Sequence, residues 1–175
     1  MTEAGKGHAT VNGGLQLSMK DISYEILDLL KQYGSSPEGI RRALDNESRP
    51  EVLHALSDIR ENLLEWLDFT GSREVLQIGS GYGVLTGLLA SRCAHVTVMD
   101  QADENLAVNR ERNKDYSNIT YGFRADAEES RPGPSYDLVV IAGLREGQEI
   151  RDAAAFGASF LGQEGRCLLY TSDAA

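Results

Sequence analysis

An apolar run followed at once by three alternating glycines limits most strongly what this chain can fold into. Residues 74–78 read EVLQI, a pattern typical of a buried strand, and Gly79, Gly81 and Gly83 follow before a helical pattern over 84–93. Residues without a Cβ atom allow a sharp turn and let a ligand lie against the backbone. We therefore expect a strand, a ligand-binding turn and a helix in that order.

The chain beyond residue 94 repeats the alternation of strands and helices. Strands are predicted at 95–100, 118–123, 136–143 and 165–170, and helices at 103–114 and 147–162. This alternation predicts an α/β fold, with a parallel sheet of about five strands and helices on both faces. Ligands of such sheets lie beyond the carboxyl ends of the strands, near the first crossover.

The part of the chain before residue 71 has a different character. Residues 1–14 are small, polar and Gly-rich, which predicts a loose tail. Residues 15–70 are expected to form a helical extension, with helices at 21–34, 35–45 and 49–67. The last of these should be a single helix that places its apolar side chains on roughly one face: Leu53, Leu56, Ile59, Leu63 and Leu67.

Composition excludes several classes of protein. The formal net charge of −10 argues against a groove for nucleic acid. Two distant cysteines, Cys93 and Cys167, make neither a disulfide framework nor a metal-binding spacing. The N-terminus lacks the apolar core of a signal peptide, and no apolar run approaches a membrane span. We expect a cytoplasmic protein with no metal, nucleic acid or membrane span.

The spacing of the glycines discriminates between nucleotide ligands. A dinucleotide fingerprint needs a small residue where Val84 stands, and a phosphate-binding P-loop needs a Gly-Lys-Ser/Thr sequence that is absent. The turn therefore suits a nucleoside better than a pyrophosphate. Asp100 ends the second strand, 21 residues after Gly79, where a carboxylate can accept both ribose hydroxyls. Asp126 follows the third strand, from which it could reach an adenine edge; a solvated turn is nearly as good an interpretation.

Four ordered segments resemble the successive motifs of class I S-adenosylmethionine-dependent methyltransferases: VLQIGSGYGVLTGLLA, VTVMD, RADAEE and YDLVVIAGL. The likeness covers about residues 50–165 and implies a Rossmann-like fold with S-adenosylmethionine as cofactor. Residues 49–67 also resemble a bacterial subgroup that is often joined to a glycosyltransferase of surface polysaccharide synthesis. That likeness implies a small-molecule or sugar hydroxyl as acceptor and a linked glycosyltransferase domain downstream.

The resemblance assigns roles to individual residues. Asp100 takes the ribose, with Gln101 beside it near the adenine, and Asp126 and Ala127 flank the adenine. Arg60 is a candidate partner for the cofactor's carboxylate, although an ion pair on its own helix is an alternative. The methionine part is expected to lie along the glycine turn, at Gly79, Ser80, Gly81 and Gly83.

Two departures from the family pattern bear on the site. Gln77 stands where the family usually has an acid that helps to hold the positive end of the cofactor's methionine. The loss of charge is expected to weaken binding by on the order of 1–3 kcal/mol, and Gln77→Glu to tighten it. Arg145 and Glu146 stand where the subgroup tends to have a Glu-Tyr-like pair near the acceptor. Catalysis by positioning needs no visible acid or base, so the catalytic residues stay unassigned.

The end of the sequence carries a separate expectation. Residues 167–175, CLLYTSDAA, match a translation of a transposon-end adaptor used in sequencing libraries. We therefore expect residues 71–166 to be an incomplete cofactor-binding domain, 167–175 to be non-native, and this fragment to be inactive. The alternatives to an active methyltransferase are a non-catalytic cofactor-binding or structural module attached to a glycosyltransferase and, disfavoured by Val84, an NAD-dependent dehydrogenase.

Overall fold

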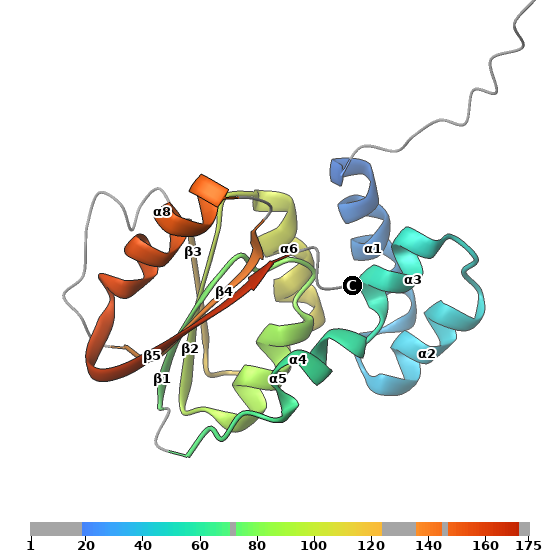
Figure 1. Cartoon of the computed structure of the whole chain (residues 1–175). Coiled ribbons are helices and arrows are strands. Elements are labelled where there is room, and N and C mark those ends of the chain that lie inside the picture. Colours follow the sequence, from blue (N-terminus) through green and yellow to red (C-terminus); the bar gives the residue numbers. More distant parts are fainter. Residues whose placement is uncertain (1–18, 71–72, 124–135, 145–146, 172–175) are drawn as a thin grey trace, which may run out of the picture.

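The computed structural model describes residues 19–70, 73–123, 136–144 and 147–171. A run of helices comes first, and from residue 74 onward strands and helices alternate among the described residues, except between the third and fourth strands (Figure 1). The helices are α1 Met19–Tyr33, α2 Pro37–Asp45, α3 Pro50–Leu56, the 3₁₀ turn η1 Ile59–Glu61, α4 Asn62–Glu65, α5 Val84–Arg92, α6 Asp103–Arg112 and α8 Gly147–Ala158. The strands are β1 Glu74–Ile78, β2 His95–Asp100, β3 Ile119–Phe123, β4 Tyr136–Leu144 and β5 Leu161–Thr171.

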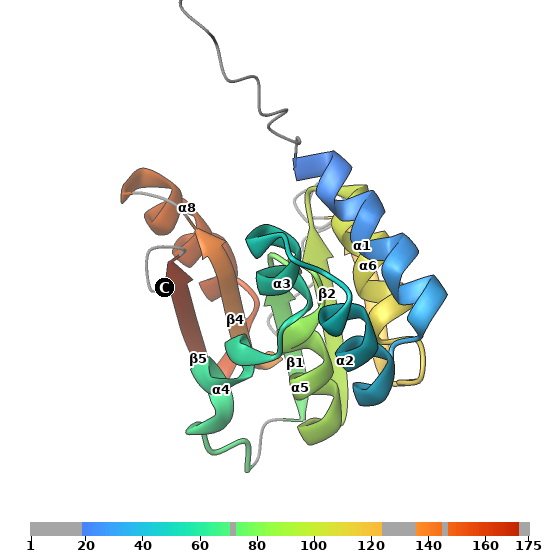
Figure 2. The same ribbon diagram turned by 90° about the vertical axis from the view of Figure 1, so that its right-hand side faces the viewer.

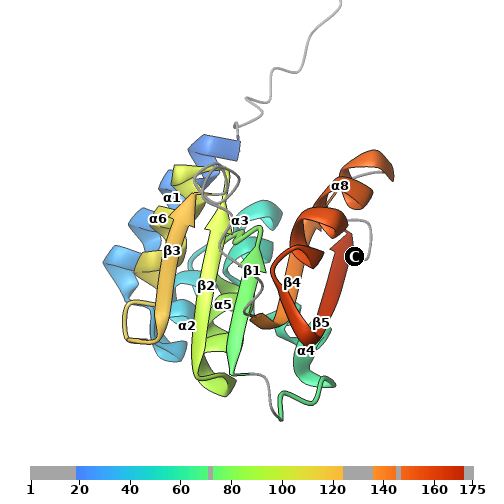
Figure 3. The ribbon, with the colours of Figure 1, turned by 90° about the vertical axis from the view of Figure 1, so that its left-hand side faces the viewer.

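The five strands form one parallel sheet in the order β3-β2-β1-β4-β5, and Figure 3 shows them side by side in this order. The chain builds outward from β1 to β3 and then crosses back to place β4 on the other side of β1. The loops that follow β1 and β4 therefore lead to opposite faces of the sheet. Ligands of such sheets bind in the crevice between these two loops, beyond the carboxyl ends of the strands. The α/β architecture predicted from the sequence is confirmed.

Apolar side chains cover both faces of the sheet, as a parallel sheet requires. Val75, Val96 and Val98 point to the face covered by α5, and Leu76 and Ile78 point to the opposite face, which is covered by α8. Figure 1 shows α8 on one side of the sheet and α5 and α6 on the other. Alternate residues of β1 thus enter different cores, and Gln77 falls on the same face as Val75.

Helices α1, α2 and α3 pack outside α6 rather than on the sheet, whereas Leu64 of α4 enters the apolar core on the α5 side of the sheet. Helix α1 lies along α6 (Figure 2), and a third apolar cluster joins α1, α2 and α3 to Val108 of α6. Arg112, in the last turn of α6, donates hydrogen bonds to the carbonyl oxygens of Ala55 and Leu56 at 3.2 and 2.7 Å. These bonds satisfy carbonyls at the end of α3 and attach the helical layer to the sheet domain.

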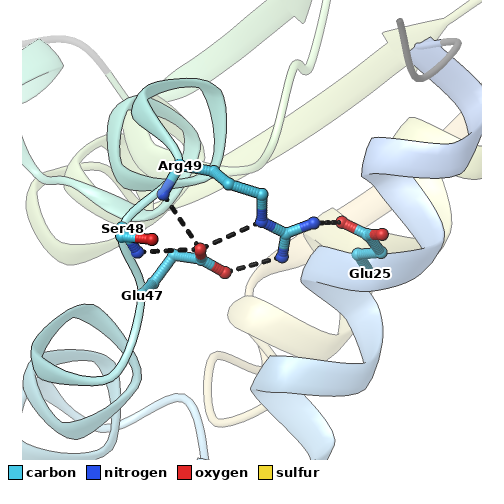
Figure 4. Close-up of polar contacts among 4 residues, drawn as sticks. All are labelled: Glu25, Glu47, Ser48 and Arg49. Carbon is cyan, nitrogen blue, oxygen red and sulfur yellow. Dashed lines mark hydrogen bonds and ion pairs between the residues drawn. The ribbon is translucent and has the colours of Figure 1, made fainter. Parts of the chain in front are cut away.

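An ion cluster on the surface fixes the loop between α2 and α3 (Figure 4). The Arg49 guanidinium contacts Glu25 of α1 and Glu47 of the loop, each at 2.6 Å. Glu47 also accepts from the backbone N–H groups of Ser48 and Arg49. The bonds from Arg49 and the loop hold the pKa of Glu47 down at about 2.

Several boundaries differ from the sequence predictions; the helix predicted at 147–162, for example, ends at Ala158. The expected single helix over 49–67 is wrong: α3 ends at Leu56, and the next residue, Ser57, has an extended backbone and a hydroxyl oxygen that accepts a hydrogen bond from the Ile59 N–H. Serine competes in this way with the helix backbone, and Ile59 is left 59% exposed. Strand β5 begins at Leu161, four residues early, because an irregular stretch with a shift in register precedes the regular pairing from Arg166.

Candidate functional site

A cavity of about 470 Å³ opens at the carboxyl ends of β1, β2 and β4. Its floor is formed by the ends of these strands, and its walls by the glycine turn after β1, the start of α6 and the α3–η1 segment. The cavity therefore lies where the strand order reverses, the position that the topology predicts for a ligand.

The glycine turn has a backbone that other residues could not adopt. Gly79 has φ +82°, and a Cβ atom there would lie 2.2 Å from the Ala142 carbonyl oxygen of β4. Its N–H donates to the Met99 carbonyl at 2.9 Å, so the turn is attached to β2 as well. Gly81 faces the cavity, and among the described residues beyond its chain neighbours a Cβ there would meet only Arg60 Nη1, at 3.8 Å. The turn thus leaves a bare wall at Gly81 that a ligand can approach.

The carboxylate of Asp100 holds the other side of the cavity. It is buried, and its Oδ2 accepts from both the backbone N–H and the hydroxyl of Ser80 at 2.7 Å. Oδ1 accepts from the Ala102 N–H at 2.9 Å, and the Asn105 amide lies 3.4 Å from both oxygens. Asp100 therefore ties the glycine turn to the start of α6 and keeps a negative charge at the cavity wall.

Arg60 reaches the cavity from η1. Its Nη2 lies 3.0 Å from Nε2 of His54, and both side chains line the cavity. A guanidinium can only donate, so the Nε2 atom of His54 is the acceptor in this contact. Within the part of the chain that the structure describes, Arg60 forms no ion pair with Asp58 or Glu61, which was the alternative considered from the sequence.

Most of the residues predicted for the site are brought together. Those that line the cavity are Arg60, Gln77, Gly79, Ser80, Gly81, Asp100 and Gln101. Gly83 instead starts α5 with φ +83° and lines a second cavity. Asp126 and Ala127, like Arg145 and Glu146, lie outside the described residues.

The sequence reasoning missed several residues of the cavity wall. Asn105 and Ala102 are at the start of α6, where the distance from Asp100 and the first helical turn could have indicated them. Ala142 and Gly143 of β4 and His54 of α3 join only through the tertiary structure.

The second cavity, of about 490 Å³, lies between α2, η1, α5 and the end of α6. Its charges are partly desolvated: burial lowers the pKa of Arg112 to about 10, and burial together with the nearby Asp58 raises the pKa of Glu61. Arg112 remains a cation at neutral pH and attracts Glu61, so the opposite charges in this cavity compensate each other.

Within the described ranges, no three His, Cys, Asp or Glu side chains gather in a group that could hold a metal ion. The helices of those ranges also lack one with the length and apolar content of a membrane span.

The part of the chain that forms the sheet is similar to known proteins. Residues 75–160 match the methyltransferase domain family. The chain is 38% identical to phosphoethanolamine N-methyltransferase 1 of Triticum aestivum over 79 residues, which cover 45% of this chain and 14% of that protein. It is 32% identical to the ubiquinone biosynthesis O-methyltransferase of Bordetella avium over 109 residues, 58% of this chain and 44% of that protein.

A solved structure has the same fold. The phosphoethanolamine N-methyltransferase 1 of Haemonchus contortus, in complex with phosphoethanolamine and S-adenosylhomocysteine, superposes with a TM-score of 0.58 at 20% identity. The superposition covers 87% of this chain and 33% of that one. The chain thus spans less than half the length of each of these three proteins.

Proposed function

We propose that residues 75–160, which match the methyltransferase domain family, form a class I S-adenosylmethionine-dependent methyltransferase domain, and that the cavity at β1, β2 and β4 holds S-adenosylmethionine for methyl transfer to a small acceptor. The observation that carries this proposal is the buried Asp100 carboxylate across the cavity from the bare turn at Gly81. A ribose needs an acceptor for two hydroxyls, and the rest of the nucleoside and its methionine tail need backbone that they can approach closely.

The residues have separate tasks in this proposal. Asp100 accepts from the ribose hydroxyls, and Gln101 lies beside the adenine. The methionine part lies along the turn from Gly79 to Gly81, and the Arg60 guanidinium neutralises its carboxylate. The bound cofactor supplies an activated methyl group on a sulfonium. The chain's contribution is to orient it and to exclude water, since an in-line displacement depends chiefly on positioning.

The acceptor is proposed only as a class: an oxygen or nitrogen nucleophile on a small molecule. Relatives with matching segments are named for N-methylation and O-methylation. The resemblance of residues 49–67 to the polysaccharide-associated subgroup favours a sugar hydroxyl, in a cytoplasmic protein linked to a glycosyltransferase. The same proposal includes three further points. The domain boundaries lie after residues 14, 70 and 166, and Asp126 and Ala127 contact the cofactor. Residues 167–175 derive from an adaptor sequence.

Calorimetric titration of the chain tests the cofactor assignment. S-adenosylmethionine and S-adenosylhomocysteine should bind, and NAD should not, because Val84 takes the place of the small residue that a pyrophosphate requires. Binding of NAD without binding of S-adenosylmethionine would refute the proposal.

A non-catalytic cofactor-binding module is the second candidate, because a buried neutral Gln77 occupies the position of the family's acid. Transfer of a labelled methyl group, measured with a panel of sugar and amine acceptors on the longest natural form of the protein, separates the two. Cofactor binding with no transfer to any of these acceptors would favour the module.

A further inference from the structure

A chain of four hydrogen-bonded side chains runs from the cavity wall into the core between α5 and α6. Gln77 Oε1 accepts from the Thr86 hydroxyl at 2.7 Å, and the Thr86 oxygen accepts from Asn109 Nδ2 at 2.7 Å. Asn109 Oδ1 accepts in turn from Asn113 Nδ2 at 2.8 Å. The four residues are between 0% and 5% exposed. A buried polar group costs folding free energy unless it has a hydrogen-bond partner. Breaking any one bond of this side-chain network would therefore leave buried groups unpaired, which stabilises the network as a whole.

Backbone carbonyls determine which atoms donate and which accept at the inner end of this hydrogen-bond network. Asn113 Nδ2 also lies 2.9 Å from the Gly83 carbonyl oxygen and 3.2 Å from the Asn109 carbonyl oxygen, and both can only accept. The Asn113 nitrogen is therefore a donor, and it must face the oxygen of the Asn109 amide. The Tyr121 hydroxyl, 3.1 Å from the same oxygen, donates to it as well.

This direction propagates to Gln77. With its oxygen facing Asn113, the Asn109 amide turns its nitrogen to the Thr86 hydroxyl. The hydroxyl has one proton, which goes to Gln77 Oε1. The outer end agrees, because Gln77 Nε2 lies 3.3 Å from the Gly79 carbonyl oxygen, where an amide oxygen would be repelled. Gly79 lines the cavity and Thr86 does not, so the nitrogen end of Gln77 is the end on the cavity side.

We propose that Gln77 is a specificity-determining donor of the cofactor cavity and that Thr86, Asn109 and Asn113 are positioning residues that maintain this polarity. The inference rests on the proposed function. An amide nitrogen carries two protons, and the Gly79 carbonyl takes one of them. The second proton can be donated to a carboxylate oxygen, whereas it would repel the protons of an ammonium group. The amino-acid end of the cofactor therefore turns its carboxylate toward Gln77.

The proposal reverses the expectation drawn from the family pattern. In Gln77→Glu, a carboxylate oxygen would face the Gly79 carbonyl in the free protein and the cofactor's carboxylate in the complex. Both contacts are repulsive, and the site is buried, so the repulsion is poorly screened. Glutamate should thus weaken binding instead of tightening it.

The test combines ligand truncation with substitution. S-adenosylhomocysteine, its decarboxylated analogue and its deaminated analogue are titrated calorimetrically into the unmodified protein, Gln77→Glu and Thr86→Val. Thr97→Val is the matched control, because Thr97 of β2 lies outside both the cavity and the hydrogen-bond chain. Removing the ligand's carboxylate should weaken binding about 10- to 100-fold in the unmodified protein and in the control.

In Gln77→Glu, removing the ligand's carboxylate should reduce the affinity at least about 10-fold less than it does in the unmodified protein. In Thr86→Val the Gln77 amide can flip, so this loss of affinity should also be smaller. Tighter binding of S-adenosylhomocysteine by Gln77→Glu, or an equal carboxylate penalty in all four proteins, would overturn the proposal. If S-adenosylhomocysteine fails to bind the unmodified protein, the proposed function fails instead. The polarity is then judged from melting without ligand, where a Gln77→Glu protein as stable as the Thr97→Val control would overturn it.

Discussion

Replacing Asp100 with Asn changes one atom of the side chain, yet it should both destabilise the fold and weaken cofactor binding. The carboxylate accepts the Ser80 N–H on Oδ2 at 2.7 Å and the Ala102 N–H on Oδ1 at 2.9 Å. An amide has a single oxygen, so in either orientation one of these backbone N–H groups must face an amide nitrogen. The Ser80 hydroxyl can rotate to another acceptor, but a backbone N–H cannot.

The magnitude follows from the loss of one hydrogen bond to a buried charged group. A buried N–H left without an acceptor costs about 1–3 kcal/mol of folding free energy. For a chain of this length, that corresponds to a melting temperature lower by roughly 2–12 °C. Loss of the acceptor for one ribose hydroxyl should weaken S-adenosylhomocysteine by a further 1–3 kcal/mol or so, about 5- to 150-fold.

Thermal melting and calorimetric titration measure the two effects separately. Asp103→Asn is the matched control: it removes the same charge from an exposed position at the start of α6, outside the cavity. It should alter the folding free energy by at most about 0.5 kcal/mol and leave affinity unchanged. If Asp100→Asn melts and binds like Asp103→Asn, the carboxylate neither anchors the glycine turn nor contacts the cofactor.

Three further predictions concern stability and reactivity. Arg112→Met should lower the free energy of unfolding by about 1–3 kcal/mol in urea denaturation, because it leaves carbonyls at the end of α3 unpaired; an unchanged midpoint would contradict this. Arg49→Gln should lower the melting temperature only slightly near neutral pH, since the cluster is at the surface and its ion pairs are screened by solvent. The Glu47 carboxyl has its pKa lowered to about 2, so this contribution is present above the unfolded pKa of about 4.5 and disappears as the pH falls toward 2. Melting curves of both proteins should therefore converge in acid. Burial raises the pKa of the Cys93 thiol to about 11, because the folded protein favours the neutral thiol over the thiolate. The free energy of unfolding should therefore fall as the pH rises from about 9, the unfolded pKa, through 11. Alkylation at pH 8 should reach Cys93 only when the chain unfolds, and rapid labelling of the native protein would argue against its burial.

Local patterns in the sequence were sufficient for the architecture and for part of the site. The order of strands and helices, the bare turn at Gly79 and Gly81, and Asp100 at the end of β2 all depend on residue type and on spacing over a few neighbours. Periods of two and 3.6 residues are properties of the backbone itself, so they can be read without knowing what packs against them. The parallel sheet then follows, because a strand, a helix and a next strand have few other ways to bury their apolar sides.

The tertiary structure alone decided which way the polar groups of the site face. Gln77 looks from the sequence like a neutral substitute for an acid, but its direction is set by Asn109 and Asn113, more than 30 residues away. Gly83, one of the three glycines of the motif, faces those same asparagines and not the cavity. The break of the expected helix at Ser57 similarly accompanies the docking of Arg112 at the end of α3. A hydrogen bond depends on the position and direction of both partners, and folding brings partners together that no local pattern relates.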